Sequence, residues 1–131
     1  MNKKVVITGV ILIVLAIVLG AFGAHALKEV LPAEKLLSFE TGVRYQMYHG
    51  IALMVIGFNA NKLNFSLKWS VGLLFIGVIF FSGSIYFLAI QPLLNVNLKF
   101  LGPITPIGGV LMITAWVLII FRLINDHQMS E

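Results

Sequence analysis

The sequence predicts an all-α fold, an integral membrane four-helix bundle with a short interfacial helical segment before the second span. Hydrophobic residues make up 60% of the 131 residues and charged residues only 11%, whereas soluble domains average about 45–50% apolar and about 25% charged. The apolar residues also gather in long runs, and about 20 of them suffice for a helix to cross a bilayer. Residues 1–131 are therefore expected to form a single transmembrane domain with lipid as its main partner.

Three of the four expected spans are long, apolar and uncharged inside. They cover about residues 5–26, 69–90 and 100–122. Basic residues stand at or beside their ends, namely Lys3, Lys4, Lys68, Lys99 and Arg122. This flanking pattern is typical of membrane spans, whose cationic ends meet anionic headgroups.

The second span, about 41–61, is shorter and less apolar than the others. Its uncharged part, Tyr45 to Ala60, contains one histidine, His49. The preceding stretch, about 32–44, is compatible with a helix, and Pro32 suits a first helical turn. We expect one continuous helix that lies at the interface first and then enters the bilayer. The alternative is a separate interfacial helix.

The distribution of Lys and Arg predicts that both chain termini lie in the cytoplasm. With four spans, the termini share one side with the loop between spans two and three, which gives five basic residues against four on the other side. The first apolar run ends in Ala24-His25-Ala26, which fits a signal-peptidase site. Its 20 residues exceed the usual 7–15 of a signal core, so we expect it to be retained.

Several classes of chemistry are excluded or disfavoured. The chain has no cysteine, which rules out disulfides, thiolate metal sites and thiol catalysis. It lacks the zinc-hydrolase, nucleophile-elbow and phosphate-loop motifs. We therefore expect no metal and no cofactor, and an enzyme is the least favoured class. Because the nine Lys and Arg form no basic stripe, no nucleic-acid partner is expected.

Small residues indicate where helices could pack closely. Lipid removes the hydrophobic drive for helix association, so small side chains that let backbones approach take its place. The first span carries Ala16, Gly20 and Ala24 at a spacing of four, and the fourth span carries Gly108 and Gly109. These residues are predicted to pack within the bundle or, alternatively, between copies in a homo-oligomer.

Polar side chains gather around the first loop and the start of the second span. Because ionisable groups inside spans are costly, they often mark function. Antiparallel packing would bring residues of all four helices to one end of the bundle, and Glu40 could pair with Arg44 one turn away. The candidate ligand-binding residues are His25, Glu40, Tyr45, Gln46, Tyr48, His49, Ser82, Ser84 and Thr105. The alternative is that the tyrosines are interfacial aromatics and the other groups are structural.

Four short motifs in these regions resemble those of a known family. They are Gly20-Ala21-Phe22-Gly23-Ala24-His25-Ala26-Leu27, Thr41-Gly42-Val43-Arg44-Tyr45-Gln46-Met47-Tyr48-His49, Phe81-Ser82-Gly83-Ser84 and Gly102-Pro103-Ile104-Thr105-Pro106-Ile107-Gly108-Gly109. The chain resembles the YgdD/YwdK-like family of small bacterial inner-membrane proteins, which are similar to a short eukaryotic transmembrane protein. The resemblance implies a four-span protein of the bacterial inner membrane. It implies no established activity, substrate or catalytic residue.

Two functions of different classes follow from these features. The first is a membrane protein that binds or moves a lipid or a small amphipathic ligand at a polar pocket near one end of the bundle. This hypothesis requires His25 and His49 to lie close together. The second is an accessory membrane subunit that packs with a partner or with itself through its small residues.

Overall fold

The computed structural model describes residues 1–128, with the backbone alone for the last two of these. Four long helices follow one another along the chain, α1 Lys3–His25, α2 Ala33–Asn59, α3 Lys68–Leu94 and α4 Ile104–Gln128. Short 3₁₀ turns join them at Leu27–Glu29, Ala60–Lys62 and Lys99–Leu101. No strand occurs within residues 1–128, so the predicted all-α bundle is confirmed. Residues 129–131 of the predicted domain lie outside the described part.

All four helices are long enough to cross a bilayer. They contain 23, 27, 27 and 25 residues, which at about 1.5 Å per residue corresponds to roughly 35–40 Å. Three segments are also sufficiently apolar to be candidate spans, Lys3–Glu29, Lys68–Leu94 and Lys99–Asp126. Helix α2 does not reach that apolarity, because four charged residues lie in its first half and polar residues such as Gln46 and His49 continue to its middle.

The segment before the second span is not a separate helix. Helix α2 follows Pro32 directly and continues without a break to Asn59. Its first half packs along the last turns of α1, where Phe39 lies against Gly23 and Val43 against Gly20. The stretch that we expected at the interface is therefore the beginning of one long helix alongside α1.

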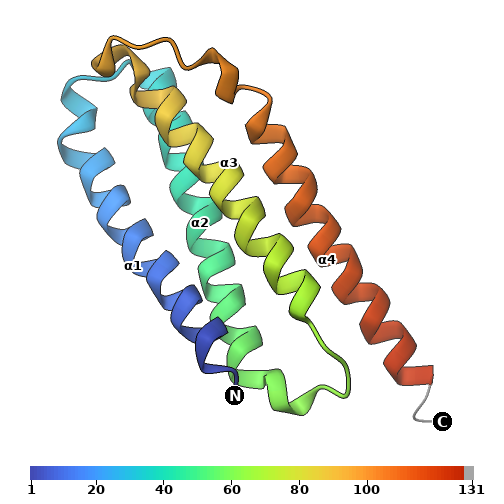
Figure 1. Ribbon diagram of the computed structural model, residues 1–131. Helices are drawn as coiled ribbons and strands as arrows, with labels where there is room; N and C mark the ends of the chain where they lie inside the picture. Colours follow the sequence, from blue (N-terminus) through green and yellow to red (C-terminus); the bar gives the residue numbers. More distant parts are fainter. Residues whose placement is uncertain (129–131) are drawn as a thin grey trace.

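The helices pack on one another in chain order. Helix α1 packs on α2, α2 on α3, and α3 on α4, as short connections between antiparallel helices require. Within residues 1–128, α1 and α4 make no extensive contact and lie at opposite sides of the central α2–α3 pair (Figure 1). The bundle is consequently open between its first and last helices.

Glycines allow the close approaches within this bundle. A Cβ on Gly9 would lie 2.6 Å from the carbonyl oxygen of Gly50 on α2, and a Cβ on Gly77 would lie 3.0 Å from that of Gly108 on α4. These distances are far below ordinary carbon–oxygen contact, so the helix backbones touch at both places. Glycine pairs of this kind drive helix association in membranes.

The predicted packing residues are partly placed as expected. Ala16 and Gly108 are buried, and Gly20 faces Val43, but Ala24 is exposed. Gly109 is half-buried, and its Cβ would be 3.9 Å from Phe81. The buried small residues of α1 are Gly9, Ala16 and Gly23, which recur every seven positions rather than every four. A seven-residue repeat suits antiparallel helices that wrap gently around each other.

Two clusters of buried side chains form the core. One is centred on Leu53 and Leu74 and reaches Leu12 and Met112, so it draws on all four helices. The other lies at the end of the bundle near the first loop and includes Leu27, Phe39 and Ala89. Most of the remaining large apolar side chains are exposed on the outer surface. Such a surface is favourable only in contact with lipid or with another protein.

Candidate functional site

Gln46 joins α1 to α3 through the middle of the bundle. It is buried at the centre of α2, and its Nε2 donates to the carbonyl oxygen of Leu12 at 2.9 Å. Its Oε1 accepts a hydrogen bond from the hydroxyl of Tyr86 at 2.6 Å. Both ends of the amide are thus used by neighbouring helices, which is what a buried amide in an apolar medium requires.

Two hydroxyls of α3 make the next links. Ser82 donates to the carbonyl oxygen of Gly42 on α2 at 2.7 Å. Ser84 lies 2.6 Å from the hydroxyl of Thr105 on α4. These short contacts fix the rotation of α3 against its neighbours on both sides.

His49 links α2 to α4. The indole Nε1 of Trp116 donates to Nε2 of His49 at 3.1 Å, so Nε2 is an acceptor. Nδ1 lies 2.8 Å from the carbonyl oxygen of Tyr45, so Nδ1 carries the ring proton. The two bonds therefore assign His49 to its neutral Nδ1-protonated tautomer.

These contacts form a polar network that ties each helix to another. Gln46, His49, Ser82 and Ser84 are all buried or nearly so. Among the side chains of residues 1–126, no buried nitrogen or oxygen lacks a hydrogen-bond partner. The groups that sequence reasoning assigned to ligand binding are here bonded to other helices.

The remaining candidate residues are not gathered with this network. His25 is exposed at the end of α1, whereas the neighbour of His49, Gly50, packs against Gly9 and Ile13. Twelve residues separate Ile13 from His25, which is roughly 18 Å along a helix axis. The structure thus places His25 and His49 at different levels of the bundle, so these two side chains do not belong to one site.

The expected pairing of Glu40 with Arg44 is also not formed. The guanidinium of Arg44 donates to the hydroxyl of Thr41 at 3.2 Å instead. Glu40 is half-exposed, and the rings of Tyr45 and Tyr48 are exposed on the outer face of α2. Among residues 1–126, whose side chains the structure describes, no His, Asp and Glu side chains cluster in a group of three that could hold a metal ion.

Sequence reasoning missed Trp116 altogether and did not include Tyr86 among the candidate site residues. A usable signal was present, because a buried indole N–H or phenol O–H needs a hydrogen-bond partner. Both residues lie inside long apolar helices, where such partners must come from another span.

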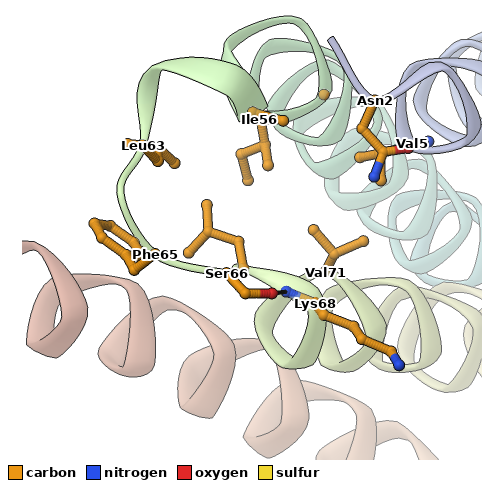
Figure 2. Close-up of a pocket in the computed structure, with 11 residues that line it drawn as sticks. Asn2, Val5, Ile56, Leu63, Phe65, Ser66, Lys68 and Val71 are labelled. Carbon is orange, nitrogen blue, oxygen red and sulfur yellow. Dashed lines mark hydrogen bonds between the residues drawn. The ribbon is translucent and has the colours of Figure 1, made fainter.

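The structure places a cavity at the opposite end of the bundle from the expected pocket. Its volume is about 260 Å³, and it lies between the start of α1, the end of α2, the following loop and the start of α3. Figure 2 shows Ile56, Leu63 and Val71 around the same space, with the Lys68 side chain directed away from it at the margin. The lining residues are Asn2, Val5, Ile56, Gly57, Ala60, Leu63, Phe65, Ser66, Leu67, Lys68 and Val71.

The polar side chains that line this cavity, which we call the basic-end cavity, are those of Asn2, Ser66 and Lys68. The side chain of Asn2 accepts from the backbone N–H of Val5 at 3.3 Å, and the hydroxyl of Ser66 accepts from that of Lys68 at 3.2 Å. A second cavity of about 330 Å³ lies nearby between the same loop and α4, with Phe65, Arg122 and Asp126 in its lining.

The two ends of the bundle differ in charge. The end with the basic-end cavity holds five basic residues and, within residues 1–128, one acidic residue, Asp126. The other end holds four basic and three acidic residues, Glu29, Glu34 and Glu40. The cavity therefore opens where the molecule would attract an anion.

The comparisons with known proteins agree with the helical structure. Residues 19–109 match the family described as "Protein of unknown function (DUF423)". The chain is similar to the UPF0382 membrane protein YwdK of Bacillus subtilis, at 42% identity over 120 residues, covering 90% of this chain and 94% of that protein. It is equally similar to a UPF0382 membrane protein of Staphylococcus epidermidis, with 42% identity over 118 residues and coverage of 90% and 93%. No solved structure matches the chain. The chain therefore belongs to the DUF423 family of UPF0382 membrane proteins.

Proposed function

We propose that this membrane protein binds an anionic amphiphile in the basic-end cavity. The observation that carries the proposal is a largely apolar cavity with Lys68 at its margin, at the end of the bundle that carries most of the basic residues, while the deeper polar groups are bonded to one another. The ligand class is a molecule with a negatively charged head and an apolar chain. A free fatty acid and an anionic membrane lipid both have this chemistry.

The apolar part of the ligand would occupy the space between Val5, Ile56 and Val71. These side chains pack on the central core beneath the cavity, so they form a firm floor. An empty apolar cavity lacks van der Waals partners on one side, and an occupant restores those contacts. At about 260 Å³ the space is slightly smaller than the roughly 300–1,000 Å³ of drug-sized sites. It would accept part of a chain rather than a whole lipid.

The charged head would lie at the margin, near Lys68. Lys62, Lys3 and Lys4 stand at the same end of the bundle. A basic residue close to an anionic headgroup contributes about 1 kcal/mol. This electrostatic term favours anionic over zwitterionic amphiphiles and gives the binding its selectivity.

The proposal includes an orientation and a location. We place the basic end, with both termini, on the cytoplasmic side of the cell membrane, because that end carries more Lys and Arg. The cavity would then sample amphiphiles of the cytoplasmic leaflet or the cytoplasm.

The test measures the ligands that remain on the protein after gentle extraction. The protein is transferred to nanodiscs that contain an anionic lipid, a zwitterionic lipid and a fatty acid, and bound species are counted by native mass spectrometry. We expect retention of an anionic species. Lys68→Gln should weaken binding roughly fivefold, which corresponds to about 1 kcal/mol, and Val71→Phe should abolish it by filling the cavity.

Matched controls come from the other end of the bundle. Lys99→Gln removes one charge there, and Val96→Phe enlarges an exposed apolar residue there. Both should leave retention unchanged. The proposal would be contradicted if retention of the amphiphile falls equally in all four variants, or if anionic and zwitterionic amphiphiles are retained equally. The bound species itself distinguishes a bilayer lipid from a free fatty acid.

A further inference from the structure

The outward face of α2 carries a regular stripe of residues that are exposed, except for the half-buried Thr41. Leu37 is 61% exposed, Tyr48 57% and Val55 51%. With the residues between them the spacing alternates four and three, which is the repeat of a helix that packs along another helix. The stripe, here called the outer stripe, consists of Leu37, Thr41, Arg44, Tyr48, Ile51 and Val55.

The polar part of the outer stripe lies at an apolar level of the bundle. Val43 faces Gly20, and Gly50 faces Gly9 and Ile13. Arg44 and Tyr48 therefore stand beside the part of α1 between Ile13 and Gly20, within its uncharged run. A charge or an unbonded hydroxyl that faces lipid at this level is costly.

Contacts within one chain leave part of the hydrogen-bonding capacity of Arg44 and Tyr48 unused. Arg44 donates to the hydroxyl of Thr41 and, among residues 1–128, forms no hydrogen bond with Glu40 one turn away. The hydroxyl of Tyr48 forms no hydrogen bond within the same described residues. The small residues of α1 are not free to pack against a further helix, because they already contact α2.

We propose that a second copy of this chain packs on the outer stripe, with α2 against α2 about a two-fold axis along the membrane normal. Two copies inserted with the same orientation can pair symmetrically only about such an axis, and each stripe then meets itself. The apolar residues Leu37, Ile51 and Val55 would pack along the seam, above and below the polar residues.

Charge complementarity favours a second copy as the occupant. Side chains of a helix point toward its N-terminus, so Arg44 extends toward the level of Glu40. In the dimer each Arg44 would reach the partner's Glu40 as well as its own. Two acids and two bases then form a neutral group at the seam, and it is shielded from lipid. The stripe together with Glu40 beside it is self-complementary, because one chain supplies both charges.

Single cysteines test this arrangement cleanly, since the chain contains none of its own. Thr41→Cys, Tyr48→Cys and Val55→Cys lie one heptad apart on the outer stripe. Oxidation in native membranes should link each of them into a dimer. Val18→Cys on α1 and Ile113→Cys on α4 are similarly exposed controls, at 57% and 65%, and should stay monomeric.

A charge exchange tests the role of Glu40 and Arg44. In the Tyr48→Cys background, Arg44→Glu should reduce cross-linking at least tenfold, and the double change Glu40→Arg with Arg44→Glu should restore it. Thermal stability in detergent shows whether each variant is folded. If Arg44→Glu does not fold, the pattern of cross-linking among the single cysteines decides alone.

Three results would overturn the proposal. They are equal cross-linking at the control cysteines, no cross-linking at the stripe cysteines, and no recovery of cross-linking in a folded double variant. If cross-linking depends on added anionic lipid and the charge exchange has no effect, Arg44 binds a lipid headgroup instead. That result would also overturn the proposal.

Discussion

His49 shows how a titratable side chain can be a structural link inside this bundle. Both ring nitrogens are used, one by the carbonyl oxygen of Tyr45 and the other by the indole of Trp116. The ring of Tyr45 also stacks on the imidazole, with centroids 6.3 Å apart. Protonation would turn Nε2 into a donor that faces the indole N–H. His49 is thus held as a neutral connector between α2 and α4.

Substitution of His49 should therefore affect stability. His49→Ala leaves the indole N–H of Trp116 without its acceptor, and an unpaired donor in apolar surroundings costs about 1–3 kcal/mol. His49→Gln keeps an acceptor and should lose less. Thermal unfolding in detergent measures both, with His25→Ala as the exposed control that should be neutral. If His49→Ala unfolds at the same temperature as the unchanged protein, the link to α4 contributes nothing.

The sequence identifies which polar residues lie inside the spans, but not which atoms they meet. Gln46, His49, Ser82, Ser84 and Thr105 were singled out because they interrupt apolar helices, and all five take part in hydrogen bonds between helices. Their partners depend on how each helix is rotated about its axis. A rotation of one residue, about 100°, replaces one neighbour with another, and hydropathy does not specify it.

At the scale of the helices, glycine contacts set how closely the elements pack. A Cβ at Gly9 would meet the backbone of α2 at Gly50 and Met54, each at 2.6 Å. Backbone atoms cannot move aside as a side chain can. Gly20 is less critical, because its Cβ would lie 3.3 Å from a side-chain carbon of Val43.

Gly9→Ala is expected to destabilise the bundle by about 1–3 kcal/mol, the usual cost of overpacking. Gly20→Ala should cost less, since Val43 can adjust. Gly72→Ala is the matched control, because nothing lies within 4 Å of its Cβ; it should be neutral or stabilise by up to about 1 kcal/mol through helix propensity. Thermal unfolding in one detergent gives the order. A Gly9 variant as stable as the Gly72 variant would show that α1 and α2 are further apart.

The helices themselves were largely predictable from the sequence. Three long apolar runs predicted three helices, and α1, α3 and α4 cover most of each run; α4 begins at Ile104 rather than near residue 100, because Lys99–Leu101 form a 3₁₀ turn. The pairing face of α1 was only partly predictable. A spacing of four selected Ala16, Gly20 and Ala24, whereas packing of two long helices selects Gly9, Ala16 and Gly23. The four-residue row drifts around the helix, so its last member, Ala24, turns toward lipid.

At the scale of the whole molecule, the asymmetry of charge predicts an orientation. Five basic residues lie at the end that carries the termini, and four at the other. A cysteine at Lys35 should react with a membrane-impermeant thiol reagent in intact cells, because the charge asymmetry predicts that this end of the bundle faces outward. A cysteine at Asn125, in the last turns of α4, should react only after permeabilisation. Reaction at Asn125 alone in intact cells would reverse the orientation.

The position of the cavity could not be predicted from the sequence. Its walls are ordinary apolar residues such as Ile56, Leu63 and Val71, and none of them stands out in an apolar chain. The cavity arises because the loop after α2 passes over the starts of α1 and α3 without filling the space between them (Figure 2). Sequence reasoning instead selected the opposite end of the bundle, where polar residues are conspicuous.

The most direct test of amphiphile binding is a structure of the protein in a bilayer, at a resolution that shows non-protein density. The bilayer should contain both anionic and zwitterionic lipids. We predict elongated density in the basic-end cavity, between Val5, Ile56 and Val71, with its headgroup beside Lys68. A cavity closed by its own side chains, or ordered density beside His25 at the other end of the bundle instead, would contradict the proposed function.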